Sequence, residues 1–394
     1  MDTRTFSLGA RGRGFLFVGE AAVLNGRFVS IDRVRDSEKS VVVAVSGGVD
    51  SSVAALLMRD AGFRVVGLTM KNYCYGDADV PDRSCCSLEA IDDARRECDR
   101  LGIPHRVADV EEFFTREVID NFLSEYANSR TPNPCVRCNS TVRFQTLVHY
   151  ADSVGVDYVA TGHYARVFEA SPGNRYLARS LNRAKDQSYF LSGVHGPVLD
   201  RVLFPLGDYE KDQVRAVAGS ASMAVANKKD SQEVCFVPDG TLKSFLESRN
   251  VSFVRGRIES TKGELLGHHH GLASYTVGQR RHVGVATGTP QYVLELDQAR
   301  NVLVVGEVDS LLRHELFFTP VWLDKTATRD ARSLSAQIRY RHRGAAVRSL
   351  TKEGAMAKVE FVDAQKAISP GQTIVLYRGE IVVGSGVIDA AARA

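Results

Sequence analysis

The sequence lacks the features of a membrane or secreted protein. No uninterrupted apolar run reaches the roughly 18 residues that a membrane-spanning helix needs, so we expect no integral membrane segment. Its seven cysteines, an odd number in 394 residues, do not resemble a secreted disulfide framework. We therefore expect a reducing, cytoplasmic compartment in which thiols do chemistry or bind metal. The net charge of only +3 indicates no particular partner, so any surface that binds nucleic acid must be local.

The first 38 residues also lack a clear targeting pattern. They contain six arginines but also five acidic residues. A transit peptide avoids acidic residues, and a secretory signal has a cleaner apolar core than GFLFVGEAAVL. We expect residues 1–38 to be an N-terminal extension, and the sequence does not reveal its role.

Strands and helices alternate in the first half of the chain. Apolar, β-branched runs at 41–45, 64–70, 105–110 and 158–163 predict strands, and segments with helical periodicity separate them. This alternation is typical of βαβ units, so residues 39–204 predict an α/β domain with a parallel sheet. Ligands of such sheets bind at the carboxyl ends of the strands.

The pattern changes at about residue 205. Short helical segments, Lys211–Ala218 and Thr241–Ser248, lie among loops in a central domain of residues 205–285. Short strands dominate residues 286–394 and predict a small antiparallel β-barrel.

The stretch SGGVDSS, residues 46–52, directly follows the first buried strand. Its glycines let backbone N–H groups turn toward one point, and the following helix adds the positive end of its dipole. Three serines add hydroxyl donors. We interpret the stretch as a cradle for the phosphates of a nucleotide. It lacks the lysine of a Walker loop, which argues against transfer of a γ-phosphoryl group.

This stretch resembles the pyrophosphate loop (PP-loop) of ATP pyrophosphatases. Those enzymes cleave ATP between the α and β phosphates and adenylate a carbonyl-like oxygen. Seven further motifs, in chain order, resemble the tRNA-specific 2-thiouridylase family: LTMKNY (68–73), RTPNPCVRCNSTVRF (130–144), TGHYAR (161–166), KDQSYFL (185–191), DSQEVCFV (230–237), YTVGQRRHVG (275–284) and RYRHRG (339–344). The resemblance implies an enzyme that uses ATP and Mg²⁺ to adenylate the wobble uridine, position 34, of lysine, glutamate and glutamine tRNAs. Sulfur then replaces the C2 oxygen.

The resemblance also implies the residues of the ATP site, with Asp50 as the carboxylate associated with Mg²⁺. Independently of it, Met70 and Gly162 lie at the carboxyl ends of predicted strands, on the same sheet edge as the loop, as one bound nucleotide requires. The implied ATP site comprises Ala44, Val45, Ser46, Gly47, Gly48, Val49, Asp50, Ser51, Met70 and Gly162.

Two cysteines match catalytic positions of the family. The position of Cys138 carries the nucleophile and that of Cys235 carries a persulfide. A uridine C2 oxygen leaves poorly, but adenylation turns it into AMP. A persulfide sulfur can then attack C2, and a second thiol must cleave the S–S bond to release the product.

The sequence departs from the family pattern at Cys135, where the best-studied members have aspartate. Any acid–base role of that aspartate therefore does not transfer to this chain. Thiolates at Cys135, Cys138 and Cys235 could instead hold a metal. Three routes stay open: a 4Fe-4S cluster, a persulfide and disulfide pathway, and structural zinc.

Positive charge and an aromatic ring occur together in Arg339–Arg343, as RNA contact requires. The resemblance adds a set of contacts to tRNA, with the anticodon stem-loop as the expected partner. These are Asn133, Pro134, Cys135, His163, Lys185, Asp186, Gln187, Arg339, Tyr340 and Gln372.

Two other functions remain as alternatives. One is a different PP-loop ligase or amidotransferase, which would not need Cys138 or Cys235. The other is a non-catalytic, metal-stapled RNA-binding protein, against which the intact loop argues. The sequence identifies neither the upstream sulfur donor (a protein or sulfide) nor the oligomeric state, and it gives no role to Cys74, Cys85 and Cys86.

Overall fold

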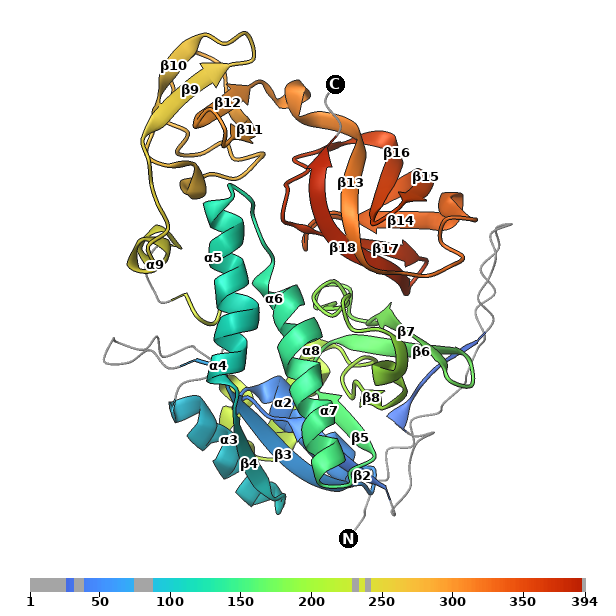
Figure 1. The fold of residues 1–394 in the computed structure, drawn as a ribbon. Coiled ribbons are helices and arrows are strands. Elements are labelled where there is room, and N and C mark those ends of the chain that lie inside the picture. The colour runs from blue at the N-terminus through green and yellow to red at the C-terminus, as the bar shows by residue number, and fades with distance from the viewer. Residues whose placement is uncertain (1–25, 32–38, 74–87, 229–233, 238–241, 392–394) are drawn as a thin grey trace.

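The computed structural model describes residues 26–31, 39–73, 88–228, 234–237 and 242–391. Most of the N-terminal extension, residues 230–233 of one motif, and Cys74, Cys85 and Cys86 lie outside the described residues. Figure 1 shows three parts: a sheet with helices, a small sheet (β9–β12), and a barrel that carries the C-terminus. In these described ranges, no helix is both long and apolar enough to cross a bilayer.

Five parallel strands form the sheet that carries the loop of residues 46–51. Their order is β4-β3-β2-β5-β8, with β2 in the centre. Their bounds are β2 Ser40–Ala44, β3 Arg64–Lys71, β4 His105–Asp109, β5 Tyr158–Thr161 and β8 Val202–Leu203. Successive strands first add on one side of β2 and then on the other, so the loop after β2 lies at the switch point of the sheet. The predicted parallel sheet is confirmed, and only the two-residue β8 was not expected.

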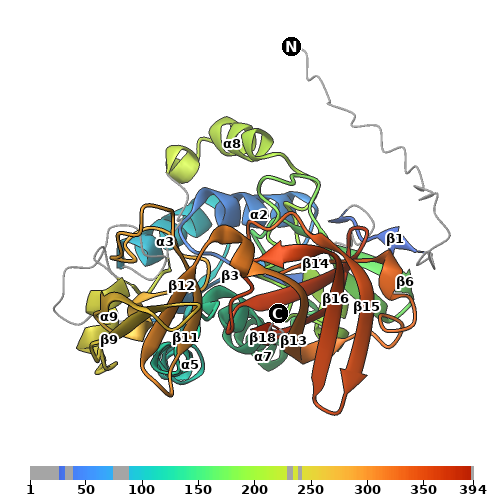
Figure 2. The same ribbon diagram turned by 90° about the horizontal axis from the view of Figure 1, so that it is seen from above.

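Both faces of this sheet are covered. Val41 and Val43 of β2 pack into one apolar cluster with helices α2 (Val49–Asp60), α3 (Leu88–Leu101) and α8 (Lys211–Ser220). Val42 packs into the cluster on the other face. A strand buried on both faces is apolar at every position, which explains the unbroken VVVAV run. Figure 2 shows α8 beside α2 on the outer side of the sheet.

Two long helical runs cover the second face and rise from the sheet toward the other two parts (Figure 1). Each contains one π-helical segment between α-helical ones. The first run is α4 Glu111–Phe114, η1 Thr115–Ile119 and α5 Asp120–Ala127. The second run is α6 Pro134–Arg137, η2 Cys138–Arg143 and α7 Phe144–Ser153. Such π segments are often found at functional sites.

The small sheet has the strand order β10-β9-β12-β11 and follows α9 (Leu242–Ser248). Its strands are β9 Gly256–Ser260, β10 Leu265–His269, β11 Tyr292–Asp297 and β12 Val302–Gly306. The sequence grouped β11 and β12 with the barrel of residues 286–394, but β12 pairs in parallel with β9. Strand periodicity predicts a strand but not its partner, and here the shared core of Ile258, Leu303 and Val305 decides the pairing.

Six antiparallel strands form the barrel, and the pairing of β17 with β18 closes it. They are β13 Leu312–Leu323, β14 Leu334–Gln337, β15 Ala345–Glu353, β16 Met356–Lys366, β17 Thr373–Arg378 and β18 Ile381–Ala391. The predicted antiparallel barrel is confirmed. A hairpin of β6 (Ala165–Ser171) and β7 (Asn174–Arg179) joins it to the first part, since Ala178 pairs with Ile381, and β1 (Arg27–Phe28) adds to β6.

Short 3₁₀ turns complete the described elements. They are η3 Gly196–Asp200, η4 Ala224–Asn227, η5 Leu272–Ser274, η6 Val308–Leu311 and η7 Ala331–Ser333.

Candidate functional site

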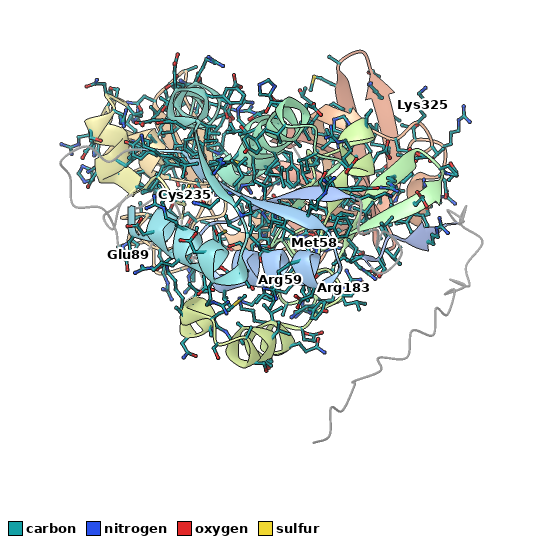
Figure 3. The ribbon with its side chains drawn as sticks, turned by 90° about the horizontal axis from the view of Figure 1, so that it is seen from below. Met58, Arg59, Glu89, Arg183, Cys235 and Lys325 are labelled. Atoms are coloured by element: carbon teal, nitrogen blue, oxygen red, sulfur yellow. The ribbon has the colours of Figure 1, made fainter. Side chains whose placement is uncertain are left out.

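One cavity of about 1350 Å³ lies where the first part, the segment around Cys235 and the barrel meet. Its lining has seven arginines and lysines but only three carboxylates, which suits a polyanion such as a nucleotide or RNA. Of the predicted site residues, it gathers Ala44, Val45, Ser46, Gly47, Gly48, Val49, Asp50, Ser51, Met70, Pro134, Cys135, Cys138, Gly162, His163, Lys185, Asp186, Gln187, Cys235 and Tyr340. Asn133, Arg339 and Gln372 are not in its lining. Figure 3 labels Cys235 and Arg183, which line it from separate segments of the chain.

The loop between β2 and α2 requires glycine. Gly47 has a φ of +68°, and a Cβ there would lie 2.2 Å from the carbonyl oxygen of Ala90. The Ser51 hydroxyl accepts from the N–H of Ser46 at 3.1 Å and donates to the carbonyl of Gly48 at 3.1 Å. Ser52 is 2% exposed. Ser46 and Ser51 therefore line the cavity, with Ser51 also closing the loop, whereas Ser52, counted among the hydroxyl donors, is buried outside the lining.

Gly162 follows β5 and lies against the start of α2. A Cβ there would lie 2.7 Å from the backbone nitrogen of Ser51 and from the carbonyl carbon of Asp50. The end of β5 and the first turn of α2 therefore approach as closely as backbone permits. The structure brings Gly162 and the loop together at one edge, as the sequence predicted.

Asp50, in the first turn of α2, has two protein partners. Lys211 Nζ at the start of α8 donates to both of its carboxylate oxygens at 2.8 Å. The hydroxyl of Tyr164, 2% exposed, donates to Oδ1 at 2.9 Å. An ammonium group thus already stands at the carboxylate that the sequence assigned to Mg²⁺.

The two-cysteine motif lies on the second helical run. Asn133 is the N-cap of this run. The Asn133 Oδ1 accepts the N–H of Val136 at 3.2 Å, and Pro134 occupies the first helical turn. Cys135 is exposed and Cys138 is buried in the cavity wall. Asn133, expected to contact tRNA, acts in this structure as a helix cap.

Aromatic packing places Cys235. Its neighbour Phe236 is 1% exposed and lies between the rings of Phe114 and Phe122, with centroids 5.8 and 5.1 Å away. Phe245 of α9 completes the cluster at 5.6 Å. This anchor holds half-buried Cys235 against the cavity that Cys138 also lines.

The three cysteines share the cavity without forming a metal-ligand set. Within the described part of the chain, no group of three or more histidine, cysteine, aspartate or glutamate residues is arranged to hold a metal ion. Cys135 is exposed, Cys138 is buried and Cys235 is half-buried, so the three thiols line the cavity at different depths.

His163 uses both ring nitrogens within the protein. Nε2 lies 3.1 Å from Nη1 of Arg143, and Nδ1 lies 2.8 Å from the Thr161 hydroxyl. Arginine can only donate, so Nε2 must accept and the proton must be on Nδ1. Burial, and then the charge of Arg143, lower the pKa of His163 to about 3. The imidazole is therefore neutral and supports Arg143, whereas the sequence assigned it to tRNA.

The Asp186 carboxylate is also used within the protein. It is 7% exposed and accepts from Arg179 Nη1 at 3.1 Å, from the N–H of Ser180 at 3.0 Å and from the Ser188 hydroxyl at 2.8 Å. Arg179 in turn lies 3.6 Å over the ring of Tyr377 in the barrel. The Asp186 carboxylate therefore fixes the loop that carries Lys185 and Gln187, and through Arg179 it connects this loop to the barrel.

The basic loop of the barrel, residues 338–344, joins β14 to β15. Gln337 Nε2 donates to the carbonyls of Arg339 and Tyr340 at 3.3 and 2.5 Å. The Tyr340 ring, 38% exposed, packs on Phe190 with centroids 4.3 Å apart. The loop is thus held at the cavity, which Arg341 and Arg343 line, while Arg339 Nη1 donates to the carbonyl of Lys366 at 3.1 Å.

A turn of the barrel contacts the segment before the two-cysteine motif. Gln372 Nε2 donates to the carbonyl of Thr131 at 3.1 Å, and the N–H of Thr131 donates to Pro370 O at 2.8 Å. A Cβ on Gly371 would lie 2.8 Å from the Thr131 nitrogen. Gln372, predicted to bind tRNA, holds this segment instead.

Sequence reasoning missed four side chains of the site. Lys211 and Tyr164 hold Asp50, whereas Arg143 and Arg179 add positive charge to the cavity. Tyr164 and Arg143 fall within motifs that the resemblance used, but their chemistry depends on partners far away in the chain. Lys211 lay in a predicted helix with no motif around it.

The fold and the loop define a nucleotide-binding protein of the HUP class that uses ATP. Residues 39–239 match the family model described as the tRNA methyl transferase HUP domain. Residues 243–307 match the tRNA methyl transferase PRC-barrel domain, and residues 314–388 match the Aminomethyltransferase beta-barrel domain. The chain belongs to the tRNA-specific 2-thiouridylase (MnmA) family.

Relatives in that family are similar over most of the chain. The tRNA-specific 2-thiouridylase MnmA of Geobacter metallireducens is 44% identical over 361 residues, covering 90% of this chain and 98% of the relative. The MnmA protein of Moorella thermoacetica is 42% identical, covering 89% of this chain and 100% of the relative. A solved 4-thiouridine synthetase–RNA complex with bound ATP is 18% identical, with a TM-score of 0.35, and covers 54% of this chain and 50% of that one. That likeness is too weak to support an inference.

Proposed function

We propose that this protein is a cytoplasmic tRNA-uridine 2-sulfurtransferase. It adenylates the wobble uridine, position 34, of lysine, glutamate and glutamine tRNAs and exchanges the C2 oxygen for sulfur. The observation that carries the proposal is that a PP-loop and two cysteines line one cavity. Although two family models are described by methyl transfer, this pairing of loop and thiols suits adenylation followed by sulfur transfer.

In the first step, uridine O2 attacks the α-phosphorus of ATP. The bond from that phosphorus to the bridging oxygen breaks, diphosphate leaves with the electron pair, and the uridine N3 proton is lost. The backbone N–H groups of Gly47 and Gly48 and the start of α2 receive the departing diphosphate. The product is an O2-adenylated uridine whose AMP group is a good leaving group.

In the second step, the terminal sulfur of a Cys235 persulfide attacks C2 and AMP leaves. The Cys138 thiolate then attacks the Cys235 sulfur of the S–S bond. This forms a Cys138–Cys235 disulfide and releases 2-thiouridine, which regains its N3 proton. The Cys235 persulfide is regenerated in one of two balanced ways. Either a thiol reductant opens the disulfide and a persulfide on an upstream donor protein transfers its outer sulfur to the Cys235 thiol, or sulfide attacks the disulfide at Cys235, which leaves a Cys235 persulfide and a Cys138 thiol.

Mg²⁺ is proposed to accompany ATP and to neutralise charge on the departing diphosphate. Asp50 is the residue that would hold it. Because Lys211 already donates to both Asp50 oxygens, the ion must displace this ammonium or share the carboxylate with it. No step is derived through a 4Fe-4S cluster, because the three cysteines are not arranged to hold one.

The RNA is proposed to lie across the cavity mouth. Lys185, Gln187, Tyr340 and Arg341 line the cavity directly, and the exposed Arg339 extends the positive charge beyond it. The anticodon stem-loop could place its wobble base between the loop and Cys138. His163, Asp186 and Gln372 support this surface through protein contacts.

The test is anaerobic incubation of the purified protein with tRNA transcript, a persulfide sulfur donor, a thiol reductant and labelled ATP. We expect AMP, diphosphate and 2-thiouridine in equal amounts. Asp50→Ala should abolish diphosphate release, whereas Cys235→Ser should still adenylate but never thiolate. Normal thiolation by Cys235→Ser, or no AMP from the wild type, would refute the proposal. An iron and acid-labile sulfide assay of the same sample tests the cluster route.

A further inference from the structure

We propose that Arg143 is a further catalytic residue: it binds the α-phosphate of ATP and of the adenylated uridine, with His163 and Asn139 as its positioning residues. The inference rests on the proposed function and deepens it. It assigns a role to a cavity arginine to which the sequence gave none.

The π-helical segment η2 sets the direction of Arg143. Backbone bonds in a π-helix join residues five apart, so Cys138 and Arg143, its two ends, lie about one turn apart on the same side. In an α-helix, residues five apart diverge by about 140° around the axis. The segment therefore turns a thiol and a guanidinium toward one cavity, and both line it.

Two uncharged acceptors fix the guanidinium. Nη1 of Arg143 donates to Asn139 Oδ1 at 3.0 Å and to His163 Nε2 at 3.1 Å. These bonds orient the group without neutralising its charge. An oriented guanidinium suits phosphate, whose oxygens it can bind in pairs.

The support of Arg143 stands at the nucleotide loop. His163 and its partner Thr161 flank Gly162, whose missing Cβ allows β5 to touch Asp50 and Ser51. Arg143 is thus held from the loop side by β5 and shares a helix face with Cys138. The ligand group that must lie between loop and thiol is the α-phosphate, because the β and γ phosphates leave together.

The α-phosphate gains negative charge twice in the reaction. In the first step its oxygens are charged while uridine O2 bonds to phosphorus and diphosphate departs. In the second step sulfur attacks C2, and AMP leaves with the electron pair of the broken C2–O bond. One fixed cation can stabilise both transition states without moving. Arg143 satisfies this requirement from a single position.

The experiment measures diphosphate release in a single turnover with transcript and labelled ATP. We expect Arg143→Gln to slow release by about 100-fold, while the affinity for α,β-methylene-ATP falls by less than about tenfold. The matched control is Arg116→Gln, a 62% exposed arginine in the other π segment, η1, which should stay within about twofold of the wild type.

Two further measurements separate this role from others. His163→Gln should slow release by about tenfold but add little in the Arg143→Gln background, since both changes remove the same contact. If thermal melting shows that Arg143→Gln does not fold, Arg143→Lys decides, with release about tenfold slower expected. Wild-type release in the folded variant would overturn the inference, as would a changed alkylation rate of Cys138 with release unaltered. A wild type that forms no diphosphate would refute the proposed function itself.

Discussion

The two rims of the cavity are built in different ways. The nucleotide rim, residues 46–51 with Gly162, consists of backbone packed so closely that a Cβ at Gly47 or Gly162 would overlap other atoms. The RNA rim, residues 339–343, consists of long charged side chains on one loop. A rim built of close-packed backbone has a fixed shape, and substitution of its glycines disturbs that shape. In a rim of side chains, each charged group adds its own contribution to the binding energy, and salt can screen that contribution.

Gly162→Ala tests the nucleotide rim and should have the largest effect. The new Cβ must push β5 away from α2, so we expect diphosphate release to fall by about 100-fold and stability by about 1–3 kcal/mol. Single-turnover kinetics and urea unfolding measure the two effects. The control, Gly219→Ala in α8, adds a Cβ with nothing within 4 Å. Wild-type kinetics for Gly162→Ala would contradict the close approach of β5 to the start of α2.

Lys211→Met tests whether the Asp50 carboxylate is held by its neighbours. Lys211 is 11% exposed in this pair, so we expect a loss of about 1–2 kcal/mol in stability and about tenfold slower diphosphate release. The control is Lys243→Met, whose partner Glu247 is 51% exposed and which should change stability by less than about 0.5 kcal/mol. Equal effects of the two changes would remove Lys211 from the site.

Arg339→Ala combined with Arg341→Ala tests the RNA rim. We expect tRNA affinity to fall by about tenfold at low salt, and the slope of log affinity against log salt to decrease by about one per lost phosphate contact. The affinity for ATP should not change. Arg348→Ala, on β15 of the same barrel, is the control. An unaltered salt slope in the double variant would place the RNA elsewhere.

His163→Gln tests, through the pH dependence of stability, whether the imidazole is neutral in the folded protein. Folding holds the pKa of His163 near 3, below its usual 6.5, so the unfolded chain binds more protons between those values. The stabilising contribution is present above pH 6.5 and is lost as the pH falls toward 3, by up to about 1.4 kcal/mol per unit. The difference in unfolding free energy between the two proteins should follow this slope between pH 6 and 4.5. A difference that does not vary with pH would mean that the ring is charged in the folded state.

The nucleotide rim could be predicted from sequence because it is local. The β2 strand, the turn glycine and the start of α2 are consecutive residues, and hydrophobic runs place β3 and β5 beside them. The carboxyl ends of parallel strands must then share one edge, which brings Met70 and Gly162 to the loop.

Contacts between distant segments could not be predicted in the same way. Lys211 reaches Asp50 across 161 positions, and Gln372 reaches Thr131 across 241. Resemblance places such residues near a site without showing whether they touch the ligand. His163, Asp186 and Gln372 were assigned to RNA, but in this structure their side chains bind other parts of the protein.

The turn at Gly371 has a mechanical consequence. Its neighbours Pro370 and Gln372 are hydrogen-bonded to the N–H and the carbonyl of Thr131, and the two-cysteine helix begins three residues after Thr131. Any rotation of the barrel when RNA binds would therefore also move the helical run that carries Cys138. RNA binding to the barrel and the position of the Cys138 thiol are therefore coupled through this one backbone contact.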